Sequence, residues 1–221
     1  LATLLPLPGT PFNTCGNPSR ILMDANTDVY ATCRGAMNSN GVCKHDRFGA
    51  VLWCRDFNPQ CTSFRGIVMD GSGRFFVGCS SVPGIVYELN PATGATINQL
   101  SITHYIYGMA VDGQRIYITP GWTGGITAID LATFTIDYSI DTSIMATPPS
   151  PLPGGYGITV DQTGTVFTTV SNVIQEHDGS DGSVTNMYTV TPPIGSTWVG
   201  MYGIQAGVDG FIYASDAANK R

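Results

Sequence analysis

Residues 107–118 have the sequence Tyr-Gly-Met-Ala-Val-Asp-Gly-Gln-Arg-Ile-Tyr-Ile, in which two short apolar runs flank an Asp-Gly turn. An aspartate at this position accepts hydrogen bonds from the backbone N–H groups of the turn, and glycine adopts the positive φ that tight turns require. The stretch therefore predicts a β-hairpin. Its second run is apolar at consecutive positions, which indicates a strand that is buried on both faces.

The same hairpin pattern recurs along the chain with a regular spacing. Its copies are Ile21-Leu-Met-Asp24, Arg65-Gly-Ile-Val-Met-Asp70, Tyr107-Gly-Met-Ala-Val-Asp112, Tyr156-Gly-Ile-Thr-Val-Asp161 and the looser Tyr202-Gly-Ile-Gln-Ala-Gly-Val-Asp209. The five aspartates lie 46, 42, 49 and 48 residues apart. A period in this range is typical of repeat architectures, in which each repeat is one supersecondary unit. We expect each aspartate to cap its turn rather than to act in catalysis.

Two of the repeats continue into a third and a fourth strand-like segment. These segments are residues 84–94 and 95–102 in one repeat, and residues 125–134 and 135–140 in the next. Four strands per repeat make one blade of a β-propeller. We therefore predict an all-β fold, a β-propeller of four-stranded blades with about five blades, either as a complete ring or as part of a larger propeller.

The Gly-x-x-x-Asp hairpin and the later element Ile126-Thr-Ala-Ile-Asp-Leu-Ala-Thr133 resemble the NHL and YVTN types of β-propeller repeat. The resemblance extends from Arg20 to Ser215. It implies blades arranged around a central channel, and its motifs are shared by binding proteins, scaffolds and enzymes. The resemblance therefore implies a fold but does not select a function.

The whole chain, residues 1–221, is predicted to form a single propeller domain. Its repeats are expected near residues 20–64, 65–106, 107–155, 156–199 and 200–221. The last repeat contains only its first two strands, and a sheet edge left in this way is normally closed in propellers. We expect residues 2–9 to supply a strand that completes the last blade. The alternative is a longer protein with further blades.

The chain is acidic and contains few charged residues. Its formal net charge is -6, and charged residues make up 12% of the sequence, against a usual share of roughly 25%. Lys and Arg are absent from Ile116 to Asn219, where nine Asp and Glu occur. Such a surface repels a phosphate backbone, so nucleic-acid binding is not expected. No apolar run approaches the roughly 20 residues that a membrane span needs.

Six cysteines lie in the first 79 residues, and their even number fits a disulfide framework. They are Cys15, Cys33, Cys43, Cys54, Cys61 and Cys79. Zinc sites usually contain C-x-x-C pairs, which are absent here, so disulfides are favoured over a metal cluster. The closest pairs in the sequence, Cys33–Cys43 and Cys54–Cys61, are the local predictions among the 15 pairings that six cysteines allow. Disulfides and low charge favour an extracellular, secreted protein.

Aromatic residues are candidates for a ligand-binding face. In a propeller, Tyr107, Tyr156 and Tyr202 would ring the mouth of the channel, and Trp122 and Trp198 belong to loops on the same side. Aromatic rings combine a flat apolar face with a polar tip, which suits a sugar or a side chain of a protein partner. The alternative for each tyrosine is packing between blades.

Signals for metal binding and catalysis are weak. Asp24, Asn26 and Asp28 resemble the opening of a calcium loop, but Val29 replaces the turn-forming glycine, so a hydrogen-bonded turn is the favoured interpretation and no cofactor is expected. The three histidines fall at non-equivalent repeat positions, and no catalytic motif such as Gly-x-Ser-x-Gly occurs.

Two function classes follow from these observations. The first is a secreted, disulfide-containing propeller that binds a glycan or a protein partner, or that assembles with other copies of itself. The alternative is a secreted propeller enzyme, a lyase or a hydrolase, with its site at the channel mouth. A mouth lined by converging His, Glu and Asp would favour the enzyme, whereas an aromatic and hydroxyl-rich mouth would favour binding.

Overall fold

The computed structural model describes residues 18–33, 41–61, 63–120, 125–140, 157–170, 172–191 and 201–216. Strands, turns and loops account for these residues, and none of them belongs to a helix. The predicted all-β class is therefore confirmed. Within these ranges there is consequently no helix long and apolar enough to cross a membrane.

Within the described ranges, the strands form five antiparallel sheets, four of four strands and one of two, with neighbours in chain order. Blade one comprises β1 (Pro18–Met23), β2 (Val29–Cys33), β3 (Gly41–His45) and β4 (Val51–Asp56), and blade two comprises β5 (Phe64–Met69), β6 (Phe75–Cys79), β7 (Gly84–Leu89) and β8 (Thr96–Ile102). Blade three comprises β9 (Gly108–Val111), β10 (Arg115–Thr119), β11 (Ile126–Asp130) and β12 (Thr135–Ile140), and blade four comprises β13 (Ile158–Val160), β14 (Val166–Val170), β15 (Val173–His177) and β16 (Val184–Thr189). Blade five contains β17 (Met201–Ala206) and β18 (Ile212–Asp216).

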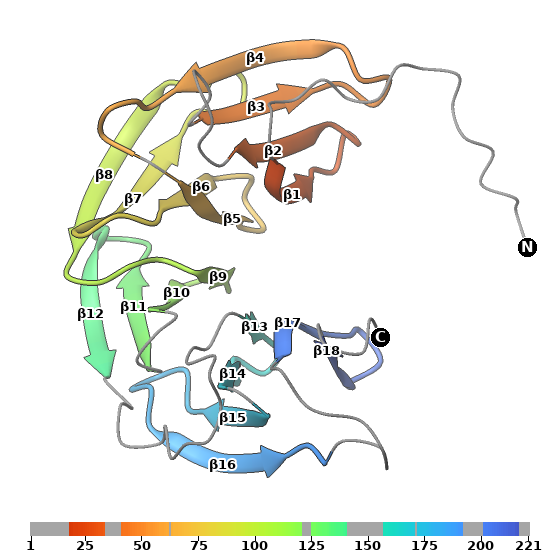
Figure 1. Ribbon diagram of the computed structural model, residues 1–221, viewed down its shortest axis with the longest axis vertical. Coiled ribbons are helices and arrows are strands. Elements are labelled where there is room, and N and C mark those ends of the chain that lie inside the picture. The colour runs from red at the N-terminus through yellow and green to blue at the C-terminus, as the bar shows by residue number, and fades with distance from the viewer. Residues whose placement is uncertain are drawn as a thin grey trace, which may run out of the picture.

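The blades follow one another around a common centre (Figure 1). The innermost strand of each blade is its first strand, and β4, β8, β12 and β16 lie at the outer edge. Neighbouring inner strands contact one another in chain order, from β1 to β5, β9, β13 and β17. This is a propeller arrangement, and its five sheets agree with the predicted number of about five blades.

Local hydrogen bonds explain why the repeated motif folds as a hairpin. Asp70 Oδ1 accepts the N–H groups of Ser72 at 2.8 Å and of Arg74 at 3.0 Å, and Gly73 has a φ of 86°. Burial raises the pKa of the Asp70 carboxyl, but the hydrogen bonds from Ser72 and Arg74 outweigh it and hold this pKa below its usual value. The predicted role of the repeat aspartates as turn caps is confirmed here.

The last hairpin explains why its motif is looser. The first position of its turn is occupied by Gly207, whose N–H donates to the carbonyl of Phe211 at 2.8 Å. The capping carboxylate comes two residues later, from Asp209, which accepts the N–H of Phe211 at 3.2 Å. The structural equivalent of the earlier turn aspartates is therefore Gly207 rather than Asp209.

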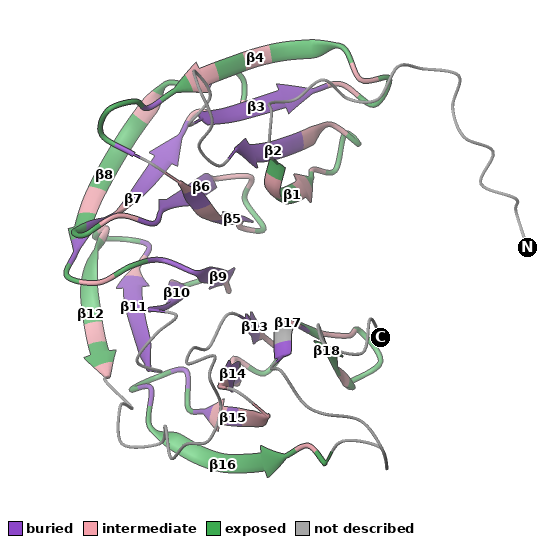
Figure 2. Cartoon of the chain, in the orientation of Figure 1, coloured by how far each residue is buried: buried purple, intermediate pink, exposed green. Residues whose placement is uncertain are grey.

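The core consists of apolar clusters at the junctions between blades. They include Tyr30, Val42, Phe75 and Leu89 at the first junction, Phe76, Val86, Ile116 and Ile129 at the second, and Tyr117, Ala128, Ile158 and Val166 at the third. Figure 2 shows the middle strands of blades one to three as buried and the outermost strands of the four-stranded blades as largely exposed. Full burial of one large apolar side chain contributes about 1.5–3 kcal/mol, so stacking of the sheets supplies most of the stability.

One position on the second strand shows how each blade meets the next. The registers of the five hairpins make Tyr30, Phe76, Tyr117, Phe167 and Tyr213 equivalent. The first four are buried, whereas Tyr213 is 56% exposed. The outer face of blade five is therefore uncovered by any blade among the described residues.

The opposite end of the arc shows the same feature. Ile67 and Met69 on β5 pack against the first cluster, but their equivalents on β1, Ile21 and Met23, are 74% and 66% exposed. The described blades thus form an arc that is open between blade one and blade five (Figure 1). The strand predicted at residues 2–9 lies outside the described residues, and its place in the last blade stays a prediction.

The disulfides differ from the predicted local pairs. The observed bonds are Cys43–Cys54 and Cys61–Cys79, with Cα–Cα distances of 4.1 and 5.7 Å, and Cys33 is also disulfide-bonded. The predicted pairs Cys33–Cys43 and Cys54–Cys61 are wrong because strand register places Cys43 directly opposite Cys54 on β4. Cys15 lies outside the described residues.

Candidate functional site

A cavity lies at the centre of the arc, where the innermost strands converge. Its volume is about 390 Å³, and its lining comes from all five blades, including Leu22, Ile67, Met109, Ile158, Thr159 and Gln205. Each innermost strand pairs on one side only within the described sheets, so its other edge offers backbone N–H and C=O groups. The described lining contains no His, Glu or Asp, so it lacks the converging groups that would favour the enzyme hypothesis.

Aromatic residues meet an arginine near the start of β9. The Cζ atom of Arg65 lies 4.2 Å from the ring centroid of Tyr107, a cation–π contact. The ring of Tyr105 approaches Tyr107 edge-on, with 6.3 Å between centroids. Tyr107 is only 6% exposed, whereas Tyr105 is 42% exposed. Of these two rings, the exposed one is therefore that of Tyr105, and the buried ring of Tyr107 contacts both Tyr105 and Arg65.

A second arginine lies on the neighbouring inner strand. Arg20 on β1 is exposed, and its guanidinium donates a long hydrogen bond of 3.5 Å to the carbonyl of Ser19. Desolvation and the positive charge of Arg65 lower the pKa of the Arg20 guanidinium, which nevertheless stays charged at neutral pH. Within the described residues, neither Arg20 nor Arg65 forms an ion pair with a carboxylate.

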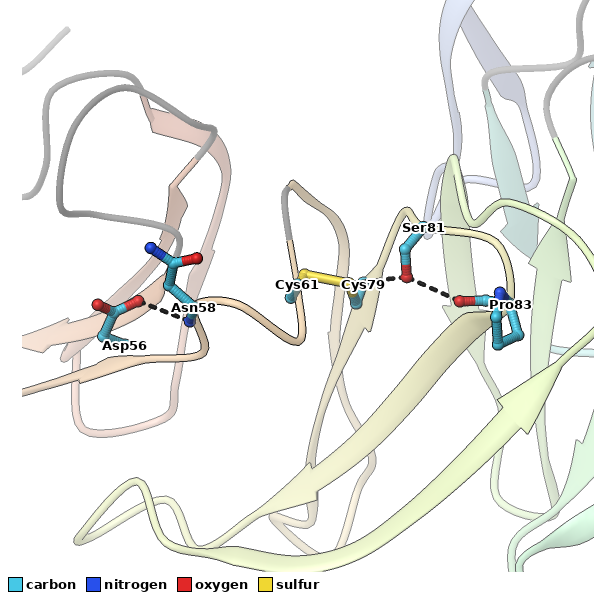
Figure 3. Close-up of a disulfide and its surroundings, with 6 residues drawn as sticks. All are labelled: Asp56, Asn58, Cys61, Cys79, Ser81 and Pro83. Carbon is cyan, nitrogen blue, oxygen red and sulfur yellow. Dashed lines mark hydrogen bonds between the residues drawn. A yellow bond between two sulfur atoms is a disulfide. The ribbon is translucent and has the colours of Figure 1, made fainter.

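A disulfide bond holds the segment that leads into Arg65, which we call the rim (residues 61 and 63–65). Cys61, in the loop after β4, is bonded to Cys79 at the end of β6, as Figure 3 shows. Nearby, the Ser81 hydroxyl donates to the carbonyl of Pro83 at 2.7 Å. Because Cys79 pairs with Phe64, the residue before Arg65, the disulfide fixes the segment that carries the arginine.

Most of the aromatic residues predicted for the ligand-binding face have no described side chain. Trp122, Tyr156 and Trp198 lie outside the described residues, and Tyr202 is placed on β17 by its backbone alone. Sequence reasoning missed Tyr105 and the two arginines. Nothing in the sequence around Tyr105 distinguishes it, because the exposure of its ring depends on how the loop before β9 packs.

The weak calcium candidate contains a lysine. Nζ of Lys44 lies 3.6 Å from Asp24 Oδ2 and 2.9 Å from Asp28 Oδ2. Burial lowers the pKa of Lys44, but its contacts with Tyr30 and Asp28 outweigh this and raise the pKa to about 12. Asp24 Oδ1 accepts the N–H of Asn26 at 2.9 Å, which is the expected hydrogen-bonded turn. An ammonium group thus already lies beside both carboxylates.

The histidines lie in three different blades or their connections. Nε2 of His104 lies 2.6 Å from the hydroxyl of Thr127, and His45 is fully buried in β3. Nδ1 of His177 donates to the carbonyl of Gly182 at 3.0 Å, so Nε2 accepts from Thr168, also at 3.0 Å. No cluster of three or more His, Cys, Asp or Glu that could hold a metal occurs in the described part of the chain.

His177 is expected to make stability depend on pH. Burial lowers its pKa, although the contact with Gly182 acts in the opposite direction. As the pH falls, His177 is therefore protonated in the unfolded chain before it is protonated in the folded protein. The free energy of unfolding does not depend on this group above about pH 6.5, and below that pH it decreases by at most about 1.4 kcal/mol per pH unit. Chemical denaturation between about pH 7 and pH 5 should show this slope, and His177→Gln should reduce it. An equal slope in both proteins would contradict the assignment.

Comparison with known proteins identifies the fold but not a family. No family model and no curated protein sequence matches this chain. A protein of unknown function from Bacteroides caccae superposes with a TM-score of 0.70 and 10% sequence identity, covering 90% of this chain and 70% of the other. BamB from Moraxella catarrhalis, a β-propeller, superposes with a TM-score of 0.59 and 16% identity, covering 91% of this chain and 58% of BamB. The propeller prediction is thereby confirmed, while the NHL or YVTN type of repeat stays a prediction.

Proposed function

We propose that this chain is a non-enzymatic binding module of a secreted protein, and that it takes a glycan or protein ligand at the mouth of its channel. The observation that carries the proposal is the exposed ring of Tyr105, which contacts Tyr107 near the start of the inner strand β9, while Arg65 lies over Tyr107. An aromatic ring held in this way loses little conformational freedom when a ligand packs against it.

The disulfides support the extracellular part of the proposal. Structural disulfides persist in oxidising compartments and are rare in the cytosol. Here one bond ties two strands of blade one together and another ties the loop of Cys61 to β6. The second bond adjoins the proposed site, so it also keeps the rim in one conformation. We further propose that NHL- or YVTN-like repeats build this module as a single domain.

Tyr105→Ala tests the proposed site. Binding to a ligand selected from an array of glycans and secreted proteins should weaken at least tenfold, which corresponds to about 1.4 kcal/mol. The reason is the loss of the ring against which the ligand packs. Isothermal titration calorimetry measures the affinity, and thermal unfolding should give a melting temperature close to that of the wild type.

Tyr188→Ala is the matched control for this experiment. Tyr188 is another exposed tyrosine, 45% exposed, but it lies on β16 at the outer edge of blade four. Its replacement should leave the affinity unchanged. Equal affinities of wild type and Tyr105→Ala would reject the channel mouth as the binding site.

A further inference from the structure

We propose that the channel mouth recognises an acidic glycan, whose carboxylate or sulfate group lies between the guanidinium groups of Arg20 and Arg65. This inference rests on the proposed function and specifies its ligand. It starts from the distribution of charge on the protein, in which these two arginines are the described cations that lie on the innermost strands of neighbouring blades.

Three of the other described cations pair with carboxylates, and the remaining two, Arg47 and Arg55, lie over aromatic rings away from the inner strands. Lys44 lies between two aspartates, Arg74 pairs with Glu88 at 2.8 Å, and Arg115 pairs with Asp137 at 2.7 Å. Arg55 donates to the carbonyl of Gly94 at 3.2 Å and lies over an aromatic ring of its own blade. Arg47 lies over the ring of Phe48 in an outer turn.

Arg20 and Arg65 are arranged differently. They belong to neighbouring inner strands, β1 and β5, and both lie near the starts of these strands. Arg65 also lies over the ring of Tyr107, which contacts the exposed ring of Tyr105. Because β1 and β5 contact each other, the two positive charges lie on adjoining strands, and the charge of Arg65 contributes to lowering the pKa of Arg20. No carboxylate of the described residues forms a salt bridge with either of them.

Two neighbouring positive charges repel each other, and an anion bound between them offsets this repulsion. A guanidinium group presents five N–H donors in a planar fork that matches the geometry of carboxylate, sulfate and phosphate. The ring of Tyr107 already orients Arg65, so little side-chain entropy is lost on binding. The protein as a whole carries a charge of -6, so attraction of an anion here is a property of this site and not of the overall field.

The neighbouring aromatic ring selects a glycan as the carrier of the anion. The ring of Tyr105 is exposed and contacts Tyr107, and Arg65 lies over the ring of Tyr107. The apolar face of a sugar can pack on such a ring while an acidic substituent reaches the guanidinium groups. Acidic peptides are the competing ligands, and the experiment includes them.

The test begins with inorganic sulfate as the smallest probe. Wild-type protein should show saturable binding of sulfate in NMR titrations against chloride at equal ionic strength. Arg20→Gln and Arg65→Gln should each weaken this binding at least tenfold. Arg47→Gln removes the same charge from an outer turn and should bind sulfate like the wild type. Absence of saturable binding by the wild type, or equal binding by all variants, would overturn the anion site.

The second arm compares a galacturonic acid trisaccharide and an acidic tripeptide with the carboxyl-reduced, neutral trisaccharide. We expect the uronate to bind most tightly, with a loss of at least tenfold both on carboxyl reduction and in Arg20→Gln. Equal affinity for the acidic and neutral sugars, lost in Tyr105→Ala, would overturn the acidic ligand while leaving the proposed binding function intact. Preference for the peptide, or binding of none of the three probes, would overturn the acidic glycan. The proposed binding function is decided separately, by the effect of Tyr105→Ala on the ligand selected from the array.

Discussion

The Tyr117→Ala variant is expected to lose about 3–5 kcal/mol of its free energy of unfolding, the usual result of truncating a buried aromatic residue. Tyr117 is 1% exposed and packs in the cluster between blades three and four. Its hydroxyl donates to Asp112 at 2.7 Å and to the carbonyl of Gly179, in the next blade, at 3.3 Å. The substitution therefore leaves a cavity and cuts the link between the blades. Equilibrium denaturation by guanidinium chloride measures the change.

Two further substitutions separate the causes of this loss. Tyr117→Phe keeps the ring and should cost only about 1 kcal/mol for the hydrogen bonds. Tyr213→Ala removes the equivalent ring of blade five, which is already 56% exposed, and should leave stability close to that of the wild type. If Tyr213→Ala destabilised the protein as much as Tyr117→Ala, the outer face of blade five would be covered in the folded chain and the open arc would be wrong.

Loss of the Cys61–Cys79 bond, in the double variant Cys61→Ser with Cys79→Ser, is expected to lower the free energy of unfolding by about 3 kcal/mol. The bond closes a loop of 18 residues, and removal of such a constraint increases the entropy of the unfolded chain. Both cysteines are fully buried beside Phe64, so the hydroxyls also replace apolar sulfur in the core. Denaturation without reducing agent measures the loss.

A protease provides the control for this second experiment. Limited proteolysis should cut the double variant faster between Phe57 and Phe64, because the loop after β4 is no longer tied to β6. The variant without Cys43–Cys54 should resist cleavage there, since that bond joins strands already paired within blade one. Equal cleavage of both variants would show that Cys61–Cys79 does not hold the rim.

The hairpins were predictable because their cause is local. In the turn after β5, Asp70, Gly73 and the two strands they connect are adjacent in the sequence, and hydrogen bonds within five residues form the turn. Regular spacing then indicated the blades, because sheets of the same kind bury their faces by stacking. The last hairpin was predicted too, but its turn was assigned to Asp209, whereas the first turn position is Gly207 and the carboxylate comes two residues later.

The disulfides and the site were predictable only in part. An even number of cysteines indicated disulfides, but the pairing followed from the register of β3 with β4, which depends on the course of the connecting turn. Tyr107 was predicted to line the channel mouth, and in the structure its ring is buried and covered by Arg65, a residue from the preceding blade. The exposed ring is Tyr105, and nothing in its sequence neighbourhood distinguishes it.

By itself, the sequence determined the hairpins, their period and the all-β class, because turn chemistry and apolar patterning act over a few residues. Only the tertiary structure decided which face of each blade is covered, which cysteines meet and which charges lie together. Arg20 and Arg65 are far apart in the chain and become neighbours through the stacking of blades one and two. The exposure of a side chain and the repulsion between two charges depend on distances between residues that are far apart in the sequence, and those distances are set only when the sheets pack together.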